Sequence, residues 1–140
     1  MKKIYIASDH AGFKLKSYIL SKFANKKKLI DLGPKSNISV DYPDYAKKVS
    51  NRVKSKKSDV GILVCGSGTG MAISANKKKG IRAAVCYNLK STRLSRQHND
   101  ANIIAIGSRL TKKNTAFKLV SVFLKTKFEG GRHQRRVKKI

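Results

Sequence analysis

The sequence is poor in acidic residues: seven Asp and Glu stand against 33 Lys and Arg, which gives a formal net charge of +26. Such a charge first suggests a nucleic-acid binder. The distribution argues against that class, because most of the cations are Lys spread along the whole chain. Specific nucleic-acid readers depend on Arg and on aromatic residues interleaved with the basic ones. We therefore expect no specific nucleic-acid partner, and a positive field that attracts small anionic substrates.

Several other features are scarce. No apolar run approaches the ~20 residues that cross a bilayer, and the basic N-terminal segment lacks the apolar stretch of a signal peptide. Two Cys do not make a disulfide framework, and two Pro with ten Gly argue against a disordered chain. These absences predict a cytoplasmic protein without a membrane segment. The 140 residues fit one domain.

Five short apolar runs, rich in β-branched residues, recur along the chain. They are nearly continuous rather than alternating, as parallel strands buried on both faces are. The runs are Lys3–Ala7, Lys28–Leu32, Val60–Cys65, Ile81–Cys86 and Asn102–Ile106. Segments with helical period separate them. The alternation predicts an α/β fold: a single-domain, Rossmann-like, three-layer α/β/α sandwich with a five-stranded parallel sheet.

The helical segments have recognisable ends. Pro43 suits the first position of a helix, Gly80 suits the residue after one, and Thr111 is a good N-cap for the final helix. The polar, Gly-containing residues from about 129 to 140 predict a C-terminal arm rather than core. The expected helices include Leu15 to Phe23, Tyr45 to Val53, Gly68 to Lys78, Leu89 to Gln97 and Phe117 to Leu124.

Polar residues follow three of the runs, where ligands bind in open parallel sheets. The strongest local signal is the loop 66–70, in which three glycines open a helix. Backbone N–H groups in such a loop form an anion-binding nest, although a plain strand-to-helix turn would look similar. Met71 stands where a dinucleotide-binding loop needs Gly, and no Gly-Lys-Ser/Thr follows. We therefore expect neither NAD nor ATP, and no other cofactor.

Two cysteines and three histidines are the remaining chemical candidates. Cys65 directly precedes the glycine loop, where a helix N-terminus favours a thiolate, although free Cys is often only a buried hydrophobe. Cys86 also ends a run, but no nest follows it, so we expect it in the core. His98 is a candidate general acid and base, or a residue that caps its helix. No two histidines share close metal-ligand spacing, so we expect no metal site.

Five motifs occur in order along the chain: Ser8-Asp9-His10-Ala11-Gly12-Phe13, Asp41-Tyr42-Pro43, Cys65-Gly66-Ser67-Gly68-Thr69-Gly70, Ser95-Arg96-Gln97-His98-Asn99-Asp100-Ala101-Asn102 and Glu129-Gly130-Gly131-Arg132-His133-Gln134-Arg135-Arg136. Together they resemble the ribose-5-phosphate isomerase B family, within the wider group that includes galactose-6-phosphate and allose-6-phosphate isomerases. The resemblance covers essentially the whole chain.

The resemblance implies a metal-independent aldose–ketose isomerase of the pentose phosphate pathway. Such an enzyme interconverts D-ribose 5-phosphate and D-ribulose 5-phosphate through a cis-enediolate. The alternative is the same chemistry on a six-carbon sugar phosphate. One branch of the family carries a Glu base at the position of Met71, so Cys65 places this chain in the Cys branch.

The same resemblance implies a role for each site residue. Cys65 moves the proton, Ser67 and the loop amides stabilise the enediolate, and His98 opens the sugar ring. It also implies a homodimer or a tetramer whose active sites are shared across the dimer interface. Arg132 and Arg136 are then supplied by the other subunit. The implied sugar and phosphate ligands are Asp9, His10, Tyr42, Gly66, Gly68, Thr69, Gly70, Asn99, Arg109, Arg132 and Arg136.

Overall fold

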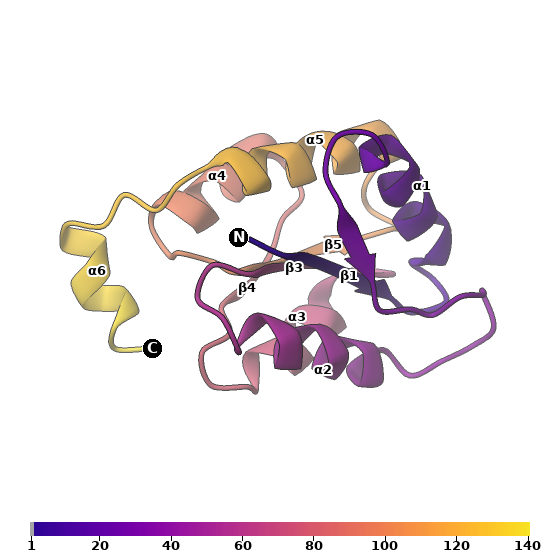
Figure 1. The fold of residues 1–140 in the computed structure, drawn as a ribbon, viewed down its shortest axis with the longest axis horizontal. Coiled ribbons are helices and arrows are strands. Elements are labelled where there is room, and N and C mark those ends of the chain that lie inside the picture. Colours follow the sequence, from indigo (N-terminus) through magenta and orange to yellow (C-terminus); the bar gives the residue numbers. More distant parts are fainter. Residues whose placement is uncertain (1) are drawn as a thin grey trace.

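The computed structural model describes residues 2–140 and shows a five-stranded parallel sheet between two layers of helices (Figure 1). The strands are β1 (Ile4–Ser8), β2 (Leu29–Asp31), β3 (Val60–Cys65), β4 (Ala83–Val85) and β5 (Ile103–Gly107), in the order β2-β1-β3-β5-β4. The predicted α/β sandwich is thus confirmed. The two edge strands are shorter than expected, with three residues each.

The helices cover both faces of the sheet, and Figure 1 shows α1, α4 and α5 on one side with α2 and α3 on the other. Side chains alternate along each strand: Ile4 and Ile6 join one buried cluster, while Tyr5 and Ala7 join the other. This double burial explains the continuous apolar runs. The helices are α1 (Phe13–Phe23), α2 (Tyr42–Val53), α3 (Thr69–Asn76), α4 (Leu89–Gln97), α5 (Lys113–Lys125) and α6 (Arg132–Val137).

The start of α5 differs from the prediction. The N-cap is Lys112, not Thr111, and no side chain caps the helix. The reason lies in the turn after β5, where the Leu110 amide bonds the Gly107 carbonyl at 3.1 Å. The helix therefore begins after this turn, and the buried Thr111 hydroxyl has no hydrogen-bond partner among residues 2–140. In α2, Pro43 lies in the first turn, one residue after Tyr42 begins the helix.

The last residues extend away from the sheet. Figure 1 shows α6 on the left, on the side from which the chain enters β1. None of the residues of α6 is buried. The Glu129 amide donates to the Gln97 carbonyl at 3.1 Å and so fastens the start of this segment to the end of α4. In residues 2–140, no helix is long and apolar enough to span a membrane.

Candidate active site

A pocket of about 370 Å³ opens at the carboxyl edge of the sheet, beyond the ends of β1, β3 and β5. Its position matches the expectation that ligands of open parallel sheets bind at this edge. The pocket is lined by Asp9, Tyr42, Cys65, Gly66, Ser67, Gly70, Arg109 and Leu110. All of these except Leu110 are residues that the sequence singled out, so the structure brings them together.

Cys65 is the last residue of β3, and its side chain lies at the floor of this pocket with 4% of its surface exposed. Its Sγ accepts a hydrogen bond from the Gly68 amide at 3.1 Å. Gly68 has φ +79°, and a Cβ there would lie 3.0 Å from the Ile106 carbonyl carbon. Only glycine fits this position without strain. The loop thus holds the Gly68 N–H against the sulfur.

Some amides of the glycine loop donate hydrogen bonds within the protein, and others are available to a ligand in the pocket. The Gly68 amide donates to Cys65, and the Thr69 amide donates to Ser67 Oγ at 3.2 Å. These two amides are therefore already paired, contrary to the expectation that all the loop amides face a ligand. Within the described chain, the amide of Gly70 has no hydrogen-bond partner, and Gly70 lines the pocket. The donor set for an anionic ligand is smaller than predicted.

Asp9 and its neighbour His10 face different surroundings. Asp9 is 7% exposed and lines the pocket, and its Oδ1 accepts from the Gly12 amide at 2.9 Å. His10 is half-buried and does not line the pocket. Its Nδ1 accepts from the Val40 amide at 3.2 Å. A neutral His10 therefore carries its proton on Nε2, which remains free to donate.

Arg109 is held by the backbone on both sides of the site. Its amide donates to the Gly66 carbonyl at 3.0 Å, and the Ser108 amide donates to the Cys65 carbonyl at 2.8 Å. A Cβ on Gly66 would lie 2.8 Å from Nη1 of Arg109, so the guanidinium lies directly over the start of the glycine loop. The exposed side chain, which lines the pocket, thus contributes a positive charge to it.

His98 lies at the opposite edge of the sheet. It caps the C-terminal end of α4, which runs back to the start of β5. The five residues of β5 separate the two edges by about 13 Å at ~3.3 Å per residue. A single chain therefore does not bring His98 to Cys65. The same holds for Asn99, which lines a different pocket beside Ile140, and for Arg132 and Arg136 on α6.

A second polar cluster surrounds His98. Its ring stacks on that of His133, with centroids 4.2 Å apart and 14° between the planes. Nε2 of His98 and Nε2 of His133 lie 3.8 Å and 3.6 Å from the same oxygen, Oε1 of Glu129. Desolvation, followed by the nearby charges of His98 and Arg132, lowers the pKa of His133. No role was predicted from the sequence for Glu129 or His133, although their i, i+4 spacing is a signal for contact.

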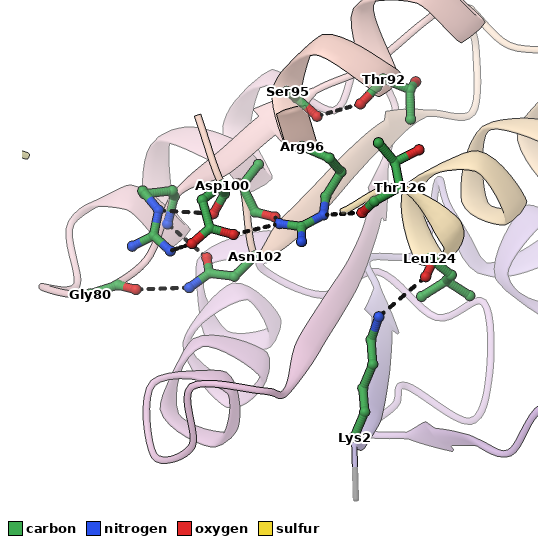
Figure 2. A network of polar contacts seen from close by, with 11 residues as sticks. Lys2, Gly80, Thr92, Ser95, Arg96, Asp100, Asn102, Leu124 and Thr126 are labelled. Atoms are coloured by element: carbon green, nitrogen blue, oxygen red, sulfur yellow. Dashed lines mark hydrogen bonds and ion pairs between the residues drawn. The ribbon is translucent and has the colours of Figure 1, made fainter. Parts of the chain in front are cut away.

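The turn after His98 is braced by an ion-pair network, which Figure 2 shows from close by. Asp100 has φ +48° and pairs with Arg96 at 2.9 Å and with Arg82 at 3.4 Å. Arg96 also donates to the Thr126 carbonyl at the end of α5 and to the Ala101 carbonyl. One guanidinium therefore fixes the turn that carries His98 relative to the segment that leads to Glu129.

Comparison with known proteins assigns the family. The family model described as ribose/galactose isomerase matches residues 4–140. The chain belongs to the ribose/galactose isomerase family. Among curated relatives, the ribose-5-phosphate isomerase B of Escherichia coli is 46% identical over 141 residues, which cover 100% of this chain and 95% of that protein. A putative sugar phosphate isomerase of Rickettsia bellii is 48% identical over 139 residues, which cover 98% of this chain and 96% of the relative.

Solved structures of family members share the whole fold. Ribose-5-phosphate isomerase B of Clostridium thermocellum superposes with a TM-score of 0.95 at 49% identity, over 99% of this chain and 94% of that one. The enzyme of Mycoplasma genitalium, solved with bound ribulose 5-phosphate, gives a TM-score of 0.95 at 44% identity, over 99% and 93% of the two chains. The family therefore spans essentially the full chain.

Proposed function

We propose that this chain is an aldose–ketose isomerase that interconverts D-ribose 5-phosphate and D-ribulose 5-phosphate. The observation that carries the proposal is the Cys65 sulfur, held at the floor of a pocket by the Gly68 amide. The family membership supports it, as do relatives named ribose-5-phosphate isomerase B. The proposal includes a place in the pentose phosphate pathway and in the cytoplasm, as the sequence predicts.

Cys65 is the proton carrier in this proposal. The thiolate takes the proton from C2 of the open-chain aldose and returns it to C1, while the proton of the C2 hydroxyl moves to the C1 oxygen. Negative charge develops on the carbonyl oxygen in between. The unpaired Gly70 amide and the Ser67 hydroxyl line the same pocket and are the donors for this oxyanion. One such donor is worth about 2.7–4 kcal/mol in other enzymes.

The phosphate group lies beside the reacting end in this proposal and does not react. Arg109 supplies a positive charge over the glycine loop, and His10 supplies an Nε2–H donor. Asp9 and Tyr42 line the same pocket and hold the sugar hydroxyls between the phosphate and the reacting carbons. Binding energy from the unreactive phosphate supports the orientation of C1 and C2 against the thiol.

A second copy of the chain supplies the remaining groups. His98, Asn99, Arg132 and Arg136 lie at the opposite edge of the sheet, where they cannot reach Cys65 of their own chain. The helix α6 buries none of its residues, so its surface is available to a second copy of the chain. We therefore include a homodimer in which each pocket receives these side chains from the other subunit, with His98 opening the sugar ring. Two-fold symmetry completes both sites at once.

An activity assay tests the chemistry. Purified protein is given ribose 5-phosphate, allose 6-phosphate or galactose 6-phosphate, and ketose formation is followed. We expect turnover of ribose 5-phosphate, and Cys65→Ala should lower it by at least ~10²-fold because it removes the base. Cys86→Ala is the matched control, since Cys86 is buried away from the pocket. Full activity of Cys65→Ala would refute the mechanism. Preferred turnover of a six-carbon sugar would support the alternative substrate class.

A mixing experiment tests the shared site separately. Cys65→Ala and His98→Ala are each inactive alone, but a mixed dimer has one pocket with both native groups. After denaturation and joint refolding, random pairing should restore about a quarter of native activity if the sites are shared across a two-fold interface. Each variant refolded alone serves as the control. No recovery, with mixed dimers demonstrated by mass spectrometry, would show that His98 does not act in the other chain's pocket.

A further inference from the structure

The cluster of His98, Glu129 and His133 has the donor set of a metal site. Within residues 2–140, these are the only three His, Cys, Asp or Glu side chains whose potential ligand atoms all lie within 4.8 Å of one another. Two imidazole nitrogens and one carboxylate oxygen are ligands that Zn²⁺ and related transition-metal ions accept. The three residues come from the end of α4 and the start of the C-terminal segment.

The spacing is slightly wider than an occupied site requires. Ligands about 2.0–2.1 Å from a tetrahedral ion lie roughly 3.3–3.4 Å from one another. Here Oε1 of Glu129 is 3.6 Å from Nε2 of His133 and 3.8 Å from Nε2 of His98. The stacked rings must also tilt apart, because an ion bound by both nitrogens lies near the plane of each ring. Both changes are side-chain rotations: that of Glu129, which is half exposed, and those of the His98 and His133 rings, which are 39% and 13% exposed.

We propose that His98, Glu129 and His133 bind one divalent transition-metal ion of the Zn²⁺ class, and that the bound ion removes His98 from the isomerisation. The remaining coordination positions face solvent or ligand. The binding claim stands on the geometry of the cluster alone. The inhibitory consequence rests on the proposed function, because it requires His98 to act in the reaction.

The charge of the ligand set bears on how tightly an ion is held. A metal binds imidazole in its neutral form and carboxylate in its ionised form. Two neutral imidazoles and one carboxylate give the ligand set a charge of −1. Arg132 and Arg136 lie near His133 and oppose a cation. Their repulsion limits the affinity and suits a reversible inhibitory ion rather than a permanently bound one.

A cobalt titration tests the binding claim. Chelator-treated protein, freed of chelator, is titrated with Co²⁺, and the visible absorption of the ion is recorded. We expect one Co²⁺ per chain with a nitrogen and oxygen ligand spectrum. Glu129→Gln and His133→Gln should each weaken binding by at least about tenfold, since even outer-shell partners of ligands are worth ~10–100-fold. His10→Gln is the matched control, because His10 lies outside the cluster.

Cys65 is the competing site for a soft ion, and Cys65→Ser distinguishes the two. Binding that survives Cys65→Ser and fails in Glu129→Gln supports the proposal. A thiolate-to-cobalt charge-transfer band that disappears in Cys65→Ser would overturn it, and so would unchanged binding in both cluster variants. Absence of stoichiometric binding to the wild type would overturn it as well.

The effect on the reaction is measured separately with Zn²⁺. The Zn²⁺ concentration that halves the isomerisation rate is measured for the wild type and for His133→Gln. We expect this concentration to be at least about tenfold higher for His133→Gln. Equal sensitivity would overturn the inhibitory role. Because metal-free wild type is assayed first, failure of the proposed isomerase activity itself appears before any metal is added.

Discussion

The pocket around Cys65 and the cluster around His98 are supported in different ways. The first lies where buried strands end, and main-chain hydrogen bonds fix its parts, such as that from the Gly68 amide to the sulfur. The second lies at the opposite edge, on a helix terminus and on a segment whose helix buries no residue. Its members contact one another through side chains, in the ring stack of His98 and His133 and in the contacts of both rings with Glu129.

This difference shows which part of the proposed active site a single chain positions by itself. A proton carrier beside fixed donors must be placed accurately, and the ends of a rigid sheet provide that accuracy. The end of α4 and the helix α6 lie toward the edge of the sheet opposite their own pocket. They become useful only when another surface meets them, and the proposed second copy is that surface. The predictions below test how firmly each region is fixed, beginning with the largest expected effect.

Gly68→Ala should damage the pocket most. The left-handed φ costs ~1–2 kcal/mol for a residue with a Cβ, and the contact 3.0 Å from Ile106 adds the cost of overpacking, for a total of roughly 2–5 kcal/mol. Gly130→Ala is the matched control, with φ +68° and no atom within 4 Å of the added Cβ. It should cost only the ~1–2 kcal/mol of the backbone change. Urea unfolding measures both, and equal losses would contradict the comparison.

Asp100→Asn should loosen the His98 region. Asn tolerates the left-handed backbone that Asp100 adopts, so the change removes mainly the charge that faces Arg96 and Arg82. We expect a loss of about 1–3 kcal/mol in unfolding free energy. Isomerase activity should fall while alkylation of Cys65 is unchanged, since the pocket is at the other edge. Asp100→Ala adds backbone strain and should be worse. An unchanged unfolding free energy in Asp100→Asn would show that the charge is unimportant.

The two cysteines should differ in reactivity. Burial raises the pKa of the Cys86 thiol, whereas Cys65 lines an open pocket and accepts a hydrogen bond from an amide. Brief treatment with iodoacetamide near neutral pH should label Cys65 alone. Peptide mass spectrometry locates the label, and added ribulose 5-phosphate should protect the site. Preferential labelling of Cys86 would contradict the assignment of the accessible thiol.

The smallest effect concerns acid stability at His133. Its folded pKa lies below the ordinary value of 6.5, so the unfolded chain binds the proton more readily. Stability therefore falls as the pH drops below that value. His133→Gln removes this contribution and should flatten the decline in melting temperature between about pH 7 and about pH 5. An identical decline in both proteins, measured without divalent metals, would show that His133 does not titrate in this way.

The layers of the fold were readable from the sequence because buried parallel strands leave continuous apolar runs. The bounds of β3 agree with the prediction, since both of its neighbours are strands and all of it is buried. The edge strands β2 and β4 are shorter than their apolar runs, because each pairs on one side only. The prediction of Thr111 as the N-cap of α5 was wrong, because the N-cap preference of Thr does not reveal the turn that precedes the helix.

The site was only partly predictable for a similar reason. Residues that directly follow strands, such as Asp9 and Arg109, lie at a known edge once the sheet is parallel. His98 ends a helix, and a helix between parallel strands returns the chain to the other edge. Sequence order alone also hid the contact between His98 and His133, which lie far apart along the chain. The groups at the two edges of the sheet can act on one ligand only if two chains assemble, and the topology of one chain does not reveal that assembly.

The hydrogen bond from the Val40 amide to Nδ1 of His10 has a consequence for substitution near the pocket. Because the donor belongs to the main chain, almost any side chain at position 40 preserves it. Proline is the exception, since it has no amide hydrogen. Variation in the loop before α2 can therefore reshape the rim around Tyr42 while His10 keeps the same tautomer, so ligand preference and proton placement can change independently.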